Sequence, residues 1–569
     1  MCGIYGITST DRNFIQSYIQ KCSHRGPDYQ DIWSDDYITL GHNLLAITSD
    51  PHQGKQPWIN HSGVLVYNGE IFNYSELSSM FPQFNPKTTC DTELLSWMLE
   101  HKKDITQIDS MHAFAYYNSQ NKTLVLSRDH AGIKPLYYAE ISQGIVFGSE
   151  IKGMLDIVPN AKKIDPIAAS CMSYTGLNPT RNTMYTNIKK VLPGETILYD
   201  ITKKKIVQQE RNVITPSSTN RLNLEQFRYE ANQTVKMCTT GLRKFGVFLS
   251  GGLDSSLIAH ELNSIMGEVN SFTNIMKPNA IIDGEDLNDD AVHAERLAND
   301  FAYNHTPITI TPSIIKESWH DSIYSMEQPV YNISMPMYYH TNKVLSQHGI
   351  VVTMAGDMGD ELLGGYVKYW KLRKQLPTTH ADLVKKWMER IKRPIQLTKS
   401  IDKNIIHQEL VKSIPEEIFN PEDPVNSYMA LDCITQVPEE FFSRNDLYGM
   451  RFSMEGRFPL ATKRFMSYCL AIHSDYKIGE NKSDTKLPTK LAYQNILPNY
   501  IINKSKTGWT VPIGSWIDTD EKLKNFAFDY MNKQDGLSDV VSNKNWNMSK
   551  TKIISWMLRS WAQIYDLHI

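Results

Sequence analysis

The sequence has little cysteine and no long apolar stretch. Its 7 cysteines in 569 residues are widely spaced, and no C-x-x-C pair or His/Cys cluster has the spacing of zinc ligands. This excludes a disulfide scaffold and a structural zinc site. No apolar run approaches the roughly 18 residues of a membrane span, and the first residues lack a basic stretch followed by an apolar core. We therefore expect a cytoplasmic protein with no membrane segment and no signal peptide.

The chain also lacks an excess of charge of one sign. It has 59 lysine and arginine residues against 62 aspartate and glutamate residues, for a formal net charge of −3. A nearly neutral chain without a basic, aromatic-rich stretch gives no electrostatic basis for binding nucleic acid. Small molecules are the expected partners, and the length predicts two to four domains.

The residue patterns change part-way along the chain. Before residue 198, short β-rich runs alternate with a helix near residues 92–101, which predicts a layered α+β domain over residues 1–197. Residues 198–221 are polar and contain a basic triplet, so we expect a linker there. Over residues 222–569, buried strands alternate with helices, the pattern of a parallel, doubly wound α/β sheet.

Cys2 is a candidate nucleophile. If Met1 is removed, the free α-amino group titrates near pH ~7.7 and lies within reach of the thiol of the same residue. The alternative is a small buried thiol at the start of a strand.

A second candidate site follows the strand predicted at residues 245–249. The segment SGGLDSS, Ser250 to Ser256, has two glycines that allow close approach of the backbone and three serines that can donate hydrogen bonds, at the start of a predicted helix. The G-x-x-x-x-G-K-[ST] phosphate loop does not occur. The alternative is a glycine turn and helix cap without a ligand.

Carboxylates in two loops favour the ligand-binding interpretation. Asp254 lies in the first loop, and Asp357, Asp360 and Glu361 follow a second buried strand that ends near residue 354. Mg²⁺ bound to a polyphosphate takes a few carboxylates from separate loops. The sequence therefore predicts a nucleotide and metal site between these loops.

An ordered series of motifs resembles a known family over nearly the whole chain. CGIYGI, SHRGPD, GHNLLAI, YNGEIFNY, CDTE, SRDHAGIKPLYY and FGSEIKG resemble class II glutamine amidotransferases. SGGLDSS, AGDMGDELLGGY and KTGWTVPIGSW resemble the synthetase half of the asparagine synthetase B family. The resemblance implies an N-terminal-nucleophile αββα sandwich followed by an ATP-pyrophosphatase domain.

The resemblance assigns roles to residues of both halves. In the glutamine site, Cys2 would be the nucleophile, and Asn68 and Gly69 the oxyanion donors. An Asn-Gly pair is typical of a hairpin turn, so we expect turn and oxyanion hole to coincide. Glu70 and Asp91 would bind glutamine, and the Asp91 carboxylate would contact the ammonium group of the glutamine.

In the ATP site, the resemblance implies that Asp254 and Asp360 hold Mg²⁺ and that Lys506 stabilises charge at the α-phosphate. The alternative is that Lys506 is a solvated surface lysine without a role in the reaction. Glu455 and Arg457 match a family frame and are expected to be architectural. The nucleotide-binding residues implied by the resemblance are Leu249, Ser250, Gly251, Gly252, Asp254, Ser255, Ser256, Ala355, Gly356 and Asp357.

Two positions depart from the family pattern. Leu44 stands where the family has an arginine that binds the α-carboxylate of glutamine, and loss of such a partner costs roughly 1.5 to 3 kcal/mol. Arg25 is a candidate replacement. Asn332 stands where dedicated asparagine synthetases have an arginine implicated in holding aspartate, and Lys368 is a candidate replacement there.

The resemblance implies an ATP- and Mg²⁺-dependent ligase that amidates a carboxylate through an acyl-adenylate. Glutamine would supply ammonia through an internal channel, and aspartate is the default acceptor. The alternatives are the same chemistry on a sugar acid, cell-wall precursor or peptide, β-lactam formation, and a regulatory protein built on a decayed enzyme. Glutamine, ATP and the carboxylate acceptor are the expected partners, with a homodimer kept as the candidate assembly.

Overall fold

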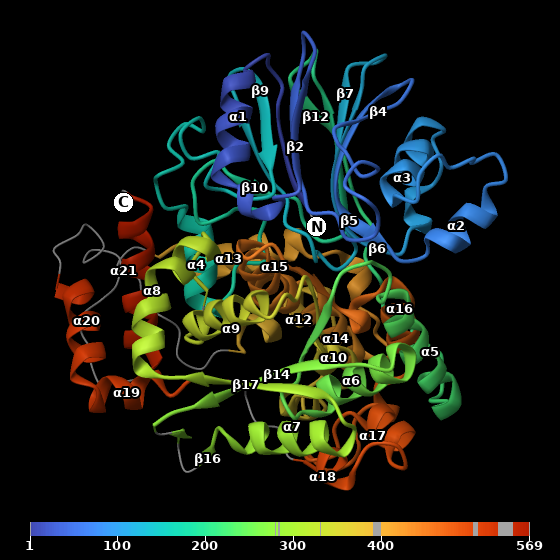
Figure 1. The fold of residues 1–569 in the computed structure, drawn as a ribbon. Coiled ribbons are helices and arrows are strands. Elements are labelled where there is room, and N and C mark those ends of the chain that lie inside the picture. The colour runs from blue at the N-terminus through green and yellow to red at the C-terminus, as the bar shows by residue number, and fades with distance from the viewer. Residues whose placement is uncertain are drawn as a thin grey trace.

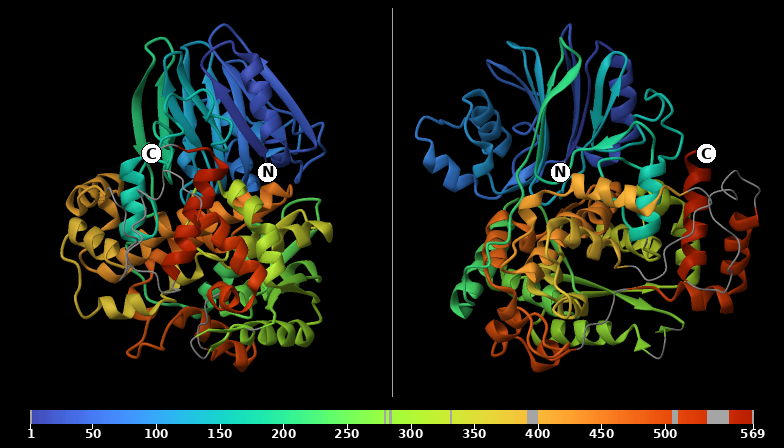
Figure 2. Two further views of the ribbon diagram at one scale, coloured as in Figure 1. Left: turned by 90° about the vertical axis from the view of Figure 1, so that its left-hand side faces the viewer. Right: turned by 180° about the vertical axis from the view of Figure 1, so that it is seen from behind.

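A computed structural model describes residues 2–278, 280–282, 285–330, 332–390, 400–504, 510–532 and 550–567. Two halves stack on one another (Figures 1 and 2): two β-sheets with their helices form the first half, and the second half surrounds a third sheet. Strand β1 (Cys2–Ile7) starts at the boundary between the halves in all three views. Among the described residues, no helix combines the length and the apolar character needed to span a membrane.

The first half contains two antiparallel sheets of six strands each. In spatial order, the strands of the first sheet are β10 (Lys189–Lys190), β8 (Tyr137–Ile141), β9 (Gly144–Gly148), β1, β3 (Thr39–Leu44) and β2 (Tyr29–Ser34). Those of the second are β12 (Lys205–Arg211), β11 (Glu195–Asp200), β7 (Thr123–Arg128), β6 (Ser110–Asn118), β5 (Gly63–Ile71) and β4 (Trp58–Ile59).

Helices cover the outer faces of both sheets. α1 (Arg12–Lys21) lies on the first sheet, where Gly41 permits close contact because a Cβ there would come within 2.5 Å of Ile15. α3 (Asp91–Glu100), with α2 (Tyr74–Met80) beside it, lies on the second. Apolar residues of both sheets fill the space between them, among them Ile4, Leu40, Val66, Leu126 and Phe147. This αββα order confirms the predicted sandwich.

The segment expected to be a linker differs from that expectation. Residues 205–211 form β12, which pairs with β11 at the edge of the second sheet. Most of the β12 side chains are exposed, because an edge strand has a neighbour on one side only. Its polar composition therefore resembles that of a linker. The second half then begins with α5 (Leu224–Met237).

The second half is built on a five-stranded parallel sheet in the order β17-β14-β13-β18-β19. Counted along the chain, this is the doubly wound order 3-2-1-4-5, whose direction of winding reverses between β13 and β18. Helices cover both faces: α7 (Asp289–Asp300) packs on β14 and β17 opposite α9 (Met335–Gln347) (Figure 1). The strands are β17 (Asn304–Ile310), β14 (Asn270–Met276), β13 (Phe245–Phe248), β18 (Val352–Met354) and β19 (Glu455–Arg457).

The remaining described helices surround this sheet and its contact with the sandwich. They are α4 (Pro166–Thr175), α6 (Leu253–Met266), α8 (Pro312–Met326), α10 (Gly359–Leu363), α11 (Val367–Leu372), α12 (His380–Met388), α13 (Lys403–Ser413), α14 (Pro424–Ile434), the π-helical turn η4 (Val437–Phe442), α15 (Ser443–Arg451), α16 (Lys463–Ala471), α17 (Leu487–Tyr493), α18 (Asn499–Ile502), α19 (Ile513–Thr519), α20 (Glu521–Asn532) and α21 (Lys550–Ile564).

Candidate active sites

Cys2 is buried at the start of β1 and contacts the neighbouring sheet. Its backbone N–H donates to Asn68 Oδ1 at 2.9 Å. Burial raises the pKa of the Cys2 thiol, and the positive charge of the amino terminus partly offsets this rise. After removal of Met1, this positive charge would be carried by the α-amine of Cys2 itself.

Asn68 has one end of its amide engaged and the other available. Its oxygen accepts from Cys2, whereas no acceptor among the described residues lies within hydrogen-bonding distance of its buried Nδ2. Unsatisfied buried donors are rare, and this one lies beside the candidate nucleophile. An oxyanion formed at Cys2 would satisfy it.

The expected turn at Asn68-Gly69 is wrong. Both residues lie inside β5, where Asn68 pairs with Ala113 and Gly69 with His112 of β6. A Cβ at Gly69 would come within 2.3 Å of the Met111 carbonyl oxygen. Glycine is required there by close packing within the sheet.

Two carboxylates lie near the nucleophile. Asp91, the first residue of α3, accepts from Tyr67 Oη at 3.0 Å and from the Ile71 N–H at 2.9 Å. Burial raises the pKa values of Glu70 and Asp91, and the charge of Asp91 raises that of Glu70 further. An ammonium group bound beside them would stabilise their charged forms and offset this rise.

Cys2, Gly69, Glu70 and Asp91 line a small pocket of about 30 Å³, whereas Asn68 lies behind Cys2 and does not line it. The described lining residues include no lysine or arginine. Leu44, at the end of β3, is 4% exposed and forms part of its apolar wall with Cys2 and Ala46. The position that would hold a cation for the glutamine α-carboxylate therefore holds a leucine, and no other lining residue replaces it.

Arg25 does not replace the missing arginine. Its side chain is 0% exposed, and its Nε donates to the Cys2 carbonyl oxygen at 3.1 Å. Its two terminal nitrogens pair with Glu150 at 3.1 Å and with Asp446 at 2.9 Å. Asp446 belongs to the second half, so Arg25 links Cys2 to the second half of the protein.

One residue of the second half lines the candidate glutamine pocket, and a second pairs with it. Glu455, on β19, lines it, and Arg457 Nε pairs with Glu455 at 2.6 Å. Although burial acts to raise the pKa of Glu455, the amino terminus and Arg457 lower it to about 2. Glu455 thus adds a negative charge from the second half to the pocket wall. From the sequence we expected only an architectural role for it.

A pocket of about 360 Å³ lies at the winding reversal of the parallel sheet. The loops after β13 and β18 meet there, as expected for the carboxyl ends of strands at a topological switch point. Gly251 has φ +76°, and a Cβ on it would come within 2.1 Å of the Asp290 carbonyl oxygen. A Cβ on Gly356 would come within 2.7 Å of the Asp254 Cβ, so only glycine lets the two loops pack this closely.

Most of the predicted nucleotide-binding residues line this pocket. Leu249, Gly251 and Ser256 do not; the Ser256 hydroxyl donates to the Gly252 carbonyl oxygen at 2.8 Å, within the first turn of α6. Lys506 lies outside the described residues. The predicted residues that do line the pocket are Ser250, Gly252, Asp254, Ser255, Ala355, Gly356, Asp357 and Asp360.

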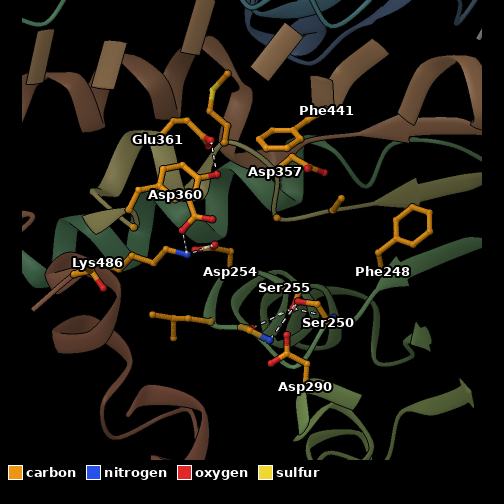
Figure 3. A pocket seen from close by; sticks show the side chains of 18 of the residues that line it. Phe248, Ser250, Asp254, Ser255, Asp290, Asp357, Asp360, Glu361, Phe441 and Lys486 are labelled. Atoms are coloured by element: carbon orange, nitrogen blue, oxygen red, sulfur yellow. Dashed lines mark hydrogen bonds and ion pairs between the residues drawn. The ribbon is translucent and has the colours of Figure 1, made fainter. Parts of the chain in front are cut away.

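Lys486 lies between the two predicted metal ligands. Its ammonium pairs with Asp254 and, at 2.6 Å, with Asp360, as Figure 3 shows. Burial opposes its charge, but the two carboxylates raise its pKa above the ordinary value. Asp254 and Asp360 are therefore close enough to share one cation, which fits a divalent ion. No group of three metal-binding side chains occurs among the described residues, so further ligands for a metal would come from a bound polyphosphate.

Other lining residues lie on two sides of this group of three charges. Figure 3 shows Asp357, Glu361 and Phe441 on one side of the Asp254–Lys486–Asp360 group, and Ser250, Ser255 and Asp290 on the other. Burial and the charge of Asp360 raise the pKa of Glu361 to about 8, and Tyr366 donates to its carboxylate at 2.8 Å. A carboxyl group with this pKa can exchange a proton near neutral pH.

The candidate replacement for the second missing arginine does not reach the pocket. Lys368 pairs with Asp432 at 2.7 Å and with Gln436 at 3.0 Å, and it is not a lining residue. Asn332 does line the pocket and donates to Glu440 at 3.1 Å. Two of the cations that line the pocket, Lys486 and Arg444, had no role assigned from the sequence.

Comparison with known proteins places both halves. The sequence profile described as a glutamine amidotransferase domain matches residues 1–211, and that described as asparagine synthase matches residues 226–563. The chain belongs to the asparagine synthase family. It has the domain pair of a glutamine-hydrolysing ligase of this family.

Relatives within the asparagine synthase family match almost end to end. "Asparagine synthetase [glutamine-hydrolyzing] 1" of Bacillus subtilis is 25% identical, with 96% of this chain and 92% of the relative covered. "Asparagine synthetase B [glutamine-hydrolyzing]" of Escherichia coli is 24% identical, with 91% and 84% covered. The solved structure of an allosteric regulatory enzyme of purine biosynthesis aligns with a TM-score of 0.29 and 15% identity, over 50% of this chain and 67% of that one.

Proposed function

We propose that the protein hydrolyses glutamine at Cys2 and uses the ammonia to amidate a carboxylate activated by ATP. By default the acceptor is aspartate, and the products are asparagine, glutamate, AMP and pyrophosphate. The alternative is the same chemistry on another carboxylate. The observation that carries the proposal is the meeting of the loops after β13 and β18 around one shared cation, in a pocket large enough for a nucleotide.

In the first reaction, the α-amine of Cys2 takes the thiol proton and the thiolate attacks the side-chain amide carbon of glutamine. The C–N bond then breaks, ammonia leaves with the proton returned by the α-amine, and water hydrolyses the resulting thioester to glutamate and the free thiol. The Asn68 Nδ2 and the Gly69 N–H stabilise the oxyanion. Asp91 and Glu70 bind the glutamine ammonium group. The unpartnered Asn68 Nδ2 supports this assignment, since its oxygen is already engaged by Cys2.

In the second reaction, the carboxylate of the acceptor attacks the α-phosphate of ATP, and pyrophosphate leaves. Ser250, Ser255 and Gly252 would bind the phosphates, and Asp254 and Asp360 would hold Mg²⁺ in place of the Lys486 ammonium. When bound, Mg²⁺ would neutralise charge on the polyphosphate. Lys506 would act at the α-phosphate.

Ammonia then attacks the acyl-adenylate, and AMP leaves with formation of the amide. The attacking nitrogen must lose a proton, and Glu361 is the base that we assign to it. Its pKa near 8 and its place in the pocket support this role.

The test is product analysis over a panel of carboxylates. With ATP, Mg²⁺ and ammonium, we expect AMP and pyrophosphate in equal amounts, and oxygen-18 from the acceptor carboxylate in AMP. ADP and inorganic phosphate as products would contradict the adenylate mechanism. No nucleotide turnover with any carboxylate would instead favour a regulatory protein built on a decayed enzyme.

A further inference from the structure

The end of the 360 Å³ pocket away from the Ser250 loop contains one cation, whose ion pair with Asp357 is long at 3.8 Å, and one half-buried anion that has no ion pair with any described residue. The cation is Arg444, on the first turn of α15, and the anion is Glu440, on the π-helical turn η4. Both line the pocket. The residues are four positions apart in a continuous helical stretch, so their side chains project from the same side of it.

The Arg444 side chain is held in place but has donors to spare. It is 7% exposed, its guanidinium lies 3.7 Å from the centre of the Tyr338 ring, and its nearest carboxylate, that of Asp357, is 3.8 Å away. No acceptor among the described residues lies within hydrogen-bonding distance of its Nε. A guanidinium stacked on a ring keeps its N–H groups directed along its edge, the geometry that binds a carboxylate with two hydrogen bonds.

Glu440 faces a neutral partner. Its only described side-chain hydrogen bond comes from the Asn332 amide, at 3.1 Å. An amide leaves the negative charge of the carboxylate uncompensated, so an ammonium group brought beside it would gain a charge-assisted hydrogen bond.

We propose that Arg444 and Glu440 select the acceptor, Arg444 by binding a carboxylate that does not react and Glu440 by binding an ammonium group. This inference rests on the proposed function and deepens it. The acceptor is then an amino acid: its α-carboxylate and α-ammonium bind this pair, and its side-chain carboxylate points toward the ATP. Arg444 thereby supplies the cation that Asn332 does not.

Three acceptors separate the two contacts. L-Aspartate carries both groups, succinate lacks the ammonium group, and β-alanine lacks the second carboxylate. With saturating ATP and ammonium, pyrophosphate release gives kcat/KM for each acceptor without any contribution from the glutamine site. We expect the wild-type protein to prefer L-aspartate to both analogues.

The variants should then show a crossed pattern. Arg444→Gln should lower kcat/KM about 10- to 150-fold for L-aspartate and succinate, mainly through KM, and leave β-alanine unchanged. Glu440→Gln should lower kcat/KM for L-aspartate and β-alanine and leave succinate unchanged. Arg444→Lys should recover part of the loss. Arg464→Gln, which removes a half-exposed ion pair with Glu230, is the matched control and should change none of the three.

Thermal unfolding of each variant checks that the fold is kept. An equal loss for all three acceptors in Arg444→Gln would mean a structural role and overturn the inference. A wild-type protein that uses a sugar acid with neither a second carboxylate nor an ammonium group better than L-aspartate would also overturn it. If no carboxylate supports AMP and pyrophosphate formation in the wild-type protein, the proposed function falls and this inference falls with it.

Discussion

The two pockets both contain groups suited to a reaction, but only one of them also contains cations that could bind an anionic substrate. The glutamine pocket, about 30 Å³, has its nucleophile and an unpartnered amide donor in place, but no lysine or arginine among its described lining residues. The ATP pocket, about 360 Å³, is lined by Arg444, Lys486, Lys490 and Lys504 as well as carboxylates. The difference teaches that groups for chemistry and groups for substrate affinity vary independently. We therefore expect the first site to be reactive but weakly binding.

The sharpest way to separate the two sites is Cys2→Ala. Glutamine hydrolysis should fall to background. Cys90 also lines that pocket, but it lies within the chain and has no α-amine to act as its base. Ammonium-supported pyrophosphate release should remain within about twofold, since the second pocket shares no lining residue with the first. A folded Cys2→Ala protein without ATP turnover would contradict the two-site arrangement.

Asp254→Ala should have the opposite effect. We expect a loss of at least ~10³-fold in AMP and pyrophosphate formation, because stabilisation of the polyphosphate charge by a metal contributes several kcal/mol. Glutamine hydrolysis, measured as glutamate release, should be unaffected. Asp289→Ala, which removes a half-exposed partner of Lys504, is the control and should retain synthesis.

Glu361 should give synthesis in the ATP pocket a pH dependence separate from that of glutamine hydrolysis. Its pKa is near 8, so its base form increases as the pH rises through 8, and ammonium-supported synthesis should rise with it at a constant concentration of uncharged ammonia. Glu361→Gln should lower the rate about 10²-fold and flatten this profile. A pH profile unchanged by the substitution would remove Glu361 from the mechanism.

The same group should affect stability in the reverse direction. The folded protein binds the Glu361 proton more tightly than the unfolded chain, where the pKa is near 4.5. The stabilising contribution is therefore full below that value and is lost as the pH rises toward 8. Tm should fall less over this range in Glu361→Gln than in the wild-type protein.

The smallest expected change is a gain in the glutamine pocket. Leu44→Arg should lower the KM for glutamine about tenfold or more, because it adds a cation for the α-carboxylate. Leu44→Met, which keeps the size without the charge, should leave it unchanged. A low KM in the wild-type protein would show that another group already binds the carboxylate.

The sequence predicted the parts of both sites that depend on local pattern. The strands before SGGLDSS and before AGDMGDE, and the helix near residues 92–101, appear within about two residues of their expected positions. Their parallel order then brings Asp254 and Asp360 together. These features follow from hydrophobic period and from glycine-containing turns, which short segments encode.

The features that escaped prediction depend on partners distant in sequence. Asn68-Gly69 resembles a turn until its pairing with β6 is known, and β12 resembles a linker until it is placed at a sheet edge. Lys486 pairs with Asp254 across 232 residues of chain. Arg25 resembles a free cation near the glutamine pocket until Glu150 and Asp446 are seen to neutralise it.

The contacts of Arg25 and Glu455 also set an order in time for how this protein matures. Cys2 is translated long before the second half, but its surroundings include Arg25 paired with Asp446, and Glu455 in the pocket wall. The first part of the active site to leave the ribosome is thus the last to be completed. A chain that ends before residue 446 should form the sandwich but show little glutamine hydrolysis, and adding residues through 457 without the synthetase fold should not restore it.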